Sequence, residues 1–249
     1  PRPDRWHERV LQQVRASPIG WRLLSGTFWS LGGAFVPRFL ELLLAVIVAR
    51  WLGKVGFGEY SSVLSTIFTV SLIAGLGLGT TATRYIATSR GHGPQQTGQI
   101  LSFVMSAAWI SGGIFAVAFW LSAPWLAERV LDNTGLTHLL RVGTPWLAFD
   151  VVSGVQGGVM IGFEEFRRLA VFNTLAYASL FLAVVAGAHW NDLTGAFWGL
   201  SAGGASTCLI MQAGVRRIMR ERGLRFEPQA WQTLLPLLWR YSLPIYVSS

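Results

Sequence analysis

Charged residues are scarce in this sequence. Asp, Glu, Lys and Arg make up only 13% of its 249 residues, whereas hydrophobic residues make up 52%. A typical soluble domain is about one-quarter charged. So little charge leaves almost no polar surface for a soluble fold of this length, so the composition argues against a water-soluble protein.

Residues that commonly carry chemistry are also few. Cysteine occurs once, at Cys208, so a disulfide bond within the chain is excluded and the redox compartment cannot be read from the sequence. The four histidines are scattered and lack the spacing of metal ligands. No Ser/His/Asp or Cys/His grouping suggests a catalytic site. We therefore expect no metal site, no cofactor and no enzymatic activity.

Long apolar runs are abundant. Six of them cover residues 23–49, 61–83, 100–121, 139–161, 169–188 and 193–215. A membrane span needs roughly 20 mostly apolar residues, and each run reaches about that length. A transmembrane barrel would instead show short alternating strands. The sequence predicts an all-α, polytopic transmembrane bundle with six complete spans and the start of a seventh.

The runs divide the chain into four parts. Residues 1–22 form a basic cytoplasmic or interfacial lead-in, and residues 23–215 form a six-helix lobe. Residues 216–233 are predicted to be a cytoplasmic linker containing an interfacial helix. Residues 234–249 open a seventh span that stops at Ser249, so we expect the chain to be part of a longer protein.

The basic residues lie mainly on one side of this arrangement. With the N-terminus in the cytoplasm, 15 of the 20 Lys and Arg residues fall inside, and only four fall in outer loops, Arg50, Lys54, Arg129 and Arg141. This bias follows the positive-inside rule. The net charge of +8 is therefore explained by topology and by contact with membrane lipids, and nucleic acid is not expected as a partner.

The first run carries two charged residues near its middle. The stretch FVPRFLELLLAVIVARWLG, residues 35–53, places Arg38 and Glu41 three positions apart, on one face of a helix. A charge at the centre of a span costs roughly 2.5–3.5 kcal/mol, so such residues face a bundle interior or a wet cavity. Two roles stay open. Arg38 and Glu41 pair with each other and hold helices together, or Arg38 contacts an anionic substrate or belongs to a charge switch.

The fourth run carries a third membrane-embedded charge, Asp150, at a depth similar to that of Arg38. Ser153 and Gly154 share its side of the helix, with Gln156 beside them. Asp150 is predicted either to pair structurally, for example with Arg38, or to couple transport to an ion or proton. We include Gln156 among the candidates for lining a cavity.

Two glycine-rich stretches also lie within the runs. GLGLGT, from Gly75, superficially resembles a nucleotide-binding loop, but no strand precedes it. SAGGAST, from Ser201, has the same small-residue character. Both are typical of closely packed membrane helices.

Several motifs resemble those of a known family. ARWLGKVGFGEYSS follows the first run, and AGLGLGTTATRYIA closes the second; FWSLGG precedes them, and RYSLPI opens the seventh run. Together they resemble the N-terminal half of the polysaccharide (O-antigen type) flippase branch of the multidrug/oligosaccharidyl-lipid/polysaccharide exporter superfamily. The motifs are concentrated in residues 27–87.

This resemblance implies two six-helix lobes, alternating access and a basic central cavity. The implied substrate is an oligosaccharide linked to a polyprenyl diphosphate, moved across a bacterial cytoplasmic membrane. On that basis Arg38 and Arg84 are candidates for contacting the diphosphate, because a guanidinium binds phosphate oxygens in a bidentate manner. Arg84 has an alternative role as a charge that ends the second span at the inner surface. The second lobe would come from the same gene or from a partner chain.

Three other functions stay open at this point, and one of them is a structural partner subunit without transport of its own. A small-molecule exporter of the same superfamily would fit the bundle, although a cavity selective for cationic drugs should be acidic. A membrane-embedded glycan polymerase or ligase would need a large outer loop with reactive residues, and no such loop is evident.

Overall fold

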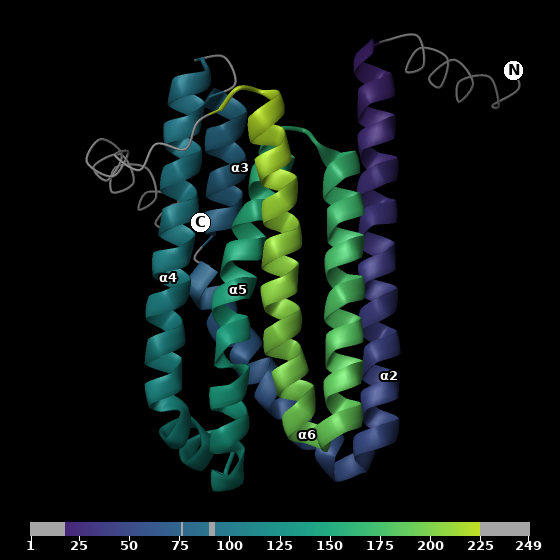
Figure 1. Ribbon diagram of the computed structural model, residues 1–249, viewed down its shortest axis with the longest axis vertical. Coiled ribbons are helices and arrows are strands. Elements are labelled where there is room, and N and C mark those ends of the chain that lie inside the picture. The colour runs from purple at the N-terminus through teal and green to yellow at the C-terminus, as the bar shows by residue number, and fades with distance from the viewer. Residues whose placement is uncertain (1–17, 76, 90–92, 225–249) are drawn as a thin grey trace, which may run out of the picture.

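The computed structural model describes residues 18–75, 77–89 and 93–224, with the backbone alone described for residues 18–32 and 34. The described chain is helical throughout and contains no strand, which confirms the all-α class. Its elements run side by side along the long axis of the molecule (Figure 1). In chain order they are α2 (Pro18–Gly75), α3 (Leu78–Ser89), α4 (Pro94–Arg129), the 3₁₀ turn η1 (Thr134–Leu136), α5 (Thr137–Gly162) and α6 (Phe166–Glu221).

The two longest helices are each broken once. In α2, Gly53 has φ 66° and ψ −173°, a conformation that favours glycine, and a Cβ there would meet no atom within 4 Å. In α6, Asn191 and Asp192 leave the helical region. Figure 1 shows the chain reversing at both breaks, at the end of the molecule where α4 also connects to α5. Each long helix is therefore two antiparallel arms.

Three helical segments are long and apolar enough to cross a membrane, Phe35–Ser89, Pro94–Arg129 and Phe166–Glu221. The first and third contain the breaks in α2 and α6. Helix α5 is not among the three, although it matches the fourth apolar run of the sequence. It packs against α2, α3, α4 and α6. The membrane-helix character is thus established, and the count of six spans stays a prediction.

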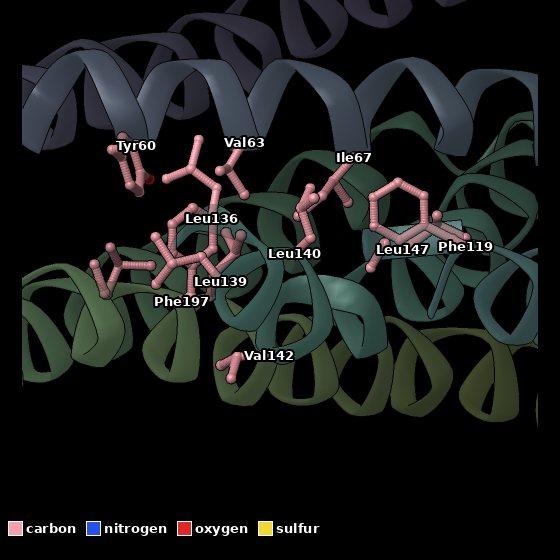
Figure 2. Packing of buried hydrophobic residues seen from close by; sticks show 14 of the residues in the cluster. Tyr60, Val63, Ile67, Phe119, Leu136, Leu139, Leu140, Val142, Leu147 and Phe197 are labelled. Atoms are coloured by element: carbon pink, nitrogen blue, oxygen red, sulfur yellow. The ribbon is translucent and has the colours of Figure 1, made fainter. Parts of the chain in front are cut away.

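Helix α5 also organises the core. Leu140 and Leu147 on α5 are fully buried, together with Ile67 of α2 and Phe197 of α6, and Phe119 of α4 closes the same cluster (Figure 2). A second buried cluster continues along α5 toward its C-terminal end. The outward faces of α2, α4 and α6 carry exposed apolar side chains, as expected where helices meet lipid.

The glycine-rich stretches pack as predicted. Gly79 of α3 lies against Gly158 of α5, and a Cβ on Gly158 would collide with the Gly79 backbone. Thr83 Oγ1 donates a hydrogen bond of 2.9 Å to the Gly158 carbonyl across the same contact. In SAGGAST, a Cβ on Gly204 would fall 2.7 Å from Cδ1 of Trp146. The small-residue interpretation of both stretches is confirmed.

Ion pairs join the turn before α6 to the end of α6. Arg168 bonds Glu221 at 2.6 Å, and Arg222 bonds Glu165 at 3.1 Å. Helix α6 continues through Glu221, so the first part of the predicted 216–233 linker is helical. The rest of that linker beyond Leu224, the predicted seventh span, and residues 1–17 of the predicted lead-in lie outside the described residues.

Candidate functional site

A cavity of about 830 Å³ lies among α2, α3, α5 and α6. Its wall is mixed: apolar side chains and glycines alternate with hydroxyl, amide and charged groups. The charged side chains in the wall are Arg38, Glu41 and Asp150. The three membrane-embedded charges that stood out in the sequence therefore come together at one site.

Arg38 and Glu41 form an ion pair on α2, with Arg38 Nη1 2.7 Å from Glu41 Oε2. The arginine side chain is 80% exposed and the glutamate 39% exposed. Because both belong to one helix, the pair does not by itself join two helices. One predicted geometry, mutual pairing, is thus observed. The exposed guanidinium still offers donors to the cavity, since its five N–H groups are not consumed by one carboxylate oxygen.

Asp150 lies on α5 and has a different partner from the one considered in the sequence. Its Oδ2 accepts a hydrogen bond of 2.5 Å from the Ser71 hydroxyl of α2. Within the described chain, no ion pair connects it to Arg38. Ser153 and Gly154 line the cavity beside it, as their shared helix face predicted. A coupling role for Asp150 stays a prediction.

Gln156 lies on another face of α5. Its side chain is fully buried, does not line this cavity, and donates a hydrogen bond of 2.8 Å from Nε2 to Gln212 Oε1 of α6. Its Oε1 is buried without a hydrogen-bond partner. Six positions separate Gln156 from Asp150, which rotates it by roughly two-thirds of a turn along a helix of 3.6 residues per turn. Gln156 therefore connects α5 to α6 and is not a cavity residue.

Arg84 is exposed on α3 and is also absent from the wall of this cavity. The resemblance grouped it with Arg38 as a phosphate contact, but the described structure does not bring these two arginines to the same cavity. The resemblance also implied a basic cavity. The described lining instead contains one guanidinium group and two carboxylates.

Several cavity residues escaped the sequence analysis. On α6, Asn173 and Tyr177 line the cavity one helical turn apart, and Tyr177 lies within electrostatic reach of Glu41 and Asp150. On α5, Trp146 lines it one turn before Asp150. The spacing of Asn173 and Tyr177, i and i+4 in an apolar run, is a signal that could have identified a polar face.

The wall suits binding better than covalent chemistry. It offers a cation, two acceptor carboxylates, hydroxyl donors and aromatic rings around a cavity large enough for a sizeable ligand. Among the described residues, no group of three His, Cys, Asp or Glu side chains could hold a metal ion.

Comparisons with known proteins agree with this fold. Two solved structures each match 94% of the chain with a TM-score of 0.69 and 18% identity, over 53% of their own length. One is a multidrug resistance MATE family transporter of the MOP superfamily in an outward-facing conformation. The other is a MOP superfamily transporter from Pyrococcus furiosus, whose binding pocket has a reverse polarity that suggests a different function. At this identity the likeness establishes the fold.

Two curated relatives come from Bacillus subtilis (strain 168). Stage V sporulation protein B is 27% identical over 153 residues, which are 61% of this chain and 30% of that protein. Sporulation protein YkvU is 26% identical over 142 residues, 57% of this chain and 31% of its own length. The chain thus matches less than a third of each curated relative and about half of each solved transporter.

The family described as "Polysaccharide biosynthesis protein" matches residues 23–249, which is most of the chain. Its family and its apolar helices make the protein a multi-pass membrane protein. The resemblance found in the sequence motifs is confirmed, and the chain belongs to the polysaccharide biosynthesis protein family.

Proposed function

We propose that this chain forms the N-terminal lobe of a flippase that carries a polyprenyl-diphosphate-linked oligosaccharide from the inner to the outer leaflet of a bacterial cytoplasmic membrane. The family match supports the polysaccharide pathway. The observation that carries the proposal is the cavity of about 830 Å³ among apolar helices, with an exposed arginine in its wall.

In this proposal Arg38 contacts the diphosphate. Its side chain is mostly exposed, and its contact with Glu41 uses Nη1, so other N–H groups are available to phosphate oxygens. The pair with Glu41 lowers the cost of holding a guanidinium at membrane depth while no substrate is bound. Arg84 is not in the cavity wall, so we assign the first phosphate contact to Arg38.

The proposal also includes a topology. The chain crosses the membrane six times, its N-terminus is cytoplasmic, and the breaks at Gly53 and at Asn191–Asp192 are outer turns. A second six-helix lobe completes the cavity from the opposite side. Two observations support this: the described start of α2 and both ends of α6 lie at one end of the molecule (Figure 1), and the solved relatives are about twice the length matched here.

We infer that the protein transports and does not catalyse a covalent reaction. Its relatives of known structure are transporters, and no nucleophile–base arrangement lies in the described cavity wall. A second candidate is export of small molecules. The carboxylates of Glu41 and Asp150 and the similarity in fold to a multidrug transporter favour small-molecule export over a glycan polymerase or ligase.

Filling the cavity tests the proposal. Gly154 lines the cavity, and a Cβ there meets nothing within 4 Å, so we expect Gly154→Phe to place its ring in the cavity. Gly113 of α4 is equally open but lies outside the cavity wall, so Gly113→Phe is the matched control. In cells that depend on the full-length protein, Gly154→Phe should abolish surface glycan at a normal protein level, and Gly113→Phe should not.

The two candidate functions give different results in the same cells. A flippase variant with a blocked cavity should accumulate the lipid-linked oligosaccharide inside the cell. A small-molecule exporter should leave that intermediate and the surface glycan unchanged, and the blocked variant should instead become sensitive to cationic drugs. Normal surface glycan in the Gly154→Phe strain would contradict the flippase proposal.

A further inference from the structure

The charges in the cavity wall do not cancel. Arg38 is paired with Glu41 at 2.7 Å, which leaves the Asp150 carboxylate as the uncompensated charge of the described lining. The lining therefore has a formal charge of −1 when all three groups are ionised. A wall built only to receive a diphosphate would be expected to carry excess positive charge instead.

Asp150 is also incompletely bonded. Ser71 donates a hydrogen bond to Oδ2, and among the described residues this is the hydrogen bond to the Asp150 side chain. Asp150 lines the cavity, so its carboxyl group has further acceptor capacity for a ligand that enters.

Two aromatic side chains line the same cavity as Asp150. Trp146 precedes Asp150 by one turn of α5 and lines the same cavity. Tyr177 of α6 lies within electrostatic reach of Asp150. A cation held between a carboxylate and aromatic faces gains from both, whereas a phosphate at this position would be repelled by the carboxylate.

We propose that Asp150 receives a protonated primary amine of the transported glycan, so that the cargo includes an amino sugar. This inference rests on the proposed function and adds the chemical class of the sugar. In this arrangement side chains of opposite charge bind the two ends of the cargo: Arg38 binds the diphosphate and Asp150 binds the amino sugar.

Binding to the purified full-length protein in lipid nanodiscs tests the proposal. The probes are glucosamine, N-acetylglucosamine and inorganic pyrophosphate, titrated separately at a pH at which the free amine is protonated. A charged hydrogen bond in a partly wet site corresponds to about a tenfold change in affinity. Glucosamine should therefore bind about ten times more tightly than N-acetylglucosamine.

Four variants complete the test. Asp150→Asn should remove the preference for glucosamine and leave pyrophosphate affinity equal or higher, and Asp150→Glu should keep most of the preference. Asp132→Asn makes the same chemical change at an exposed acid between α4 and η1, outside the cavity wall, and should behave as wild type. Arg38→Gln should weaken pyrophosphate and leave the preference for glucosamine intact.

The outcomes separate this inference from the proposed function. Equal binding of glucosamine and N-acetylglucosamine by the wild type, or an unchanged preference in Asp150→Asn, would overturn the amino-sugar site even if Arg38→Gln weakened pyrophosphate. If pyrophosphate binding did not depend on Arg38 but the glucosamine preference depended on Asp150, the amino-sugar site would stand and the diphosphate role of Arg38 would fail.

Discussion

The contact between Gly79 and Gly158 makes a prediction about stability that needs no knowledge of the substrate. A methyl group added at Gly158 would collide with the Gly79 carbonyl oxygen, and would lie 2.9 Å from its carbonyl carbon and 3.0 Å from its Cα. These are backbone atoms, which cannot rotate away as a side chain can. Gly158→Ala must therefore push α3 and α5 apart.

Gly154 provides the matched control one turn earlier on the same helix. A Cβ at Gly154 meets no atom within 4 Å. Both alanine variants gain the same helix propensity, about 1 kcal/mol relative to glycine, so this gain cancels when they are compared. The difference between them is the cost of overpacking, about 1–3 kcal/mol. Loss of the Thr83 hydrogen bond to Gly158 would add to it.

Thermal melting of the two variants of the full-length protein in detergent measures this difference. A cost of 1 kcal/mol shifts the midpoint by about 2–4 °C for chains of about 150–250 residues and by less for a longer protein, so Gly158→Ala should melt a few degrees below Gly154→Ala. Equal melting midpoints would refute the close contact between α3 and α5, and with it the placement of the cavity wall that these helices form.

Two further predictions concern function and topology. Arg38→Ala in the complete protein should abolish surface glycan at a normal protein level, because the proposed guanidinium contact with the diphosphate is removed. Arg129→Ala, at an exposed arginine that ends α4, should leave surface glycan unchanged. Normal export by Arg38→Ala would exclude the substrate contact. A reporter fused near Asn191 should be outside and one near Arg222 inside, because the proposed topology makes the break in α6 an outer turn. The opposite pattern would overturn that topology.

The sequence predicted the helical class and the charged part of the site well. Charges are costly in lipid, so Arg38, Glu41 and Asp150 stood out in apolar runs, and all three line the cavity. The small-residue packing of GLGLGT was also readable, since glycine lets two backbones approach closely.

The rest of the site depends on how distant helices cross. Ser71 became the partner of Asp150 because α2 meets α5 at that level, 79 positions apart in sequence. Nothing in the sequence distinguishes Tyr177 and Trp146 from other aromatic residues of membrane helices, and only the packing of α5 against α6 brings both into the wall of one cavity. Gln156 lies outside the wall of this cavity, and its contact with α6 could be identified only from the position of Gln212.

Flipping in a purified system tests the central claim most directly. Full-length protein is reconstituted into vesicles that contain a fluorescent polyprenyl-diphosphate-linked oligosaccharide, and the fraction of glycan exposed to an outside quencher is followed over time. The account predicts a rise in exposed glycan that requires the protein, persists with Gly113→Phe and disappears with Gly154→Phe. The same rise in vesicles without protein, or with the cavity filled, would contradict it.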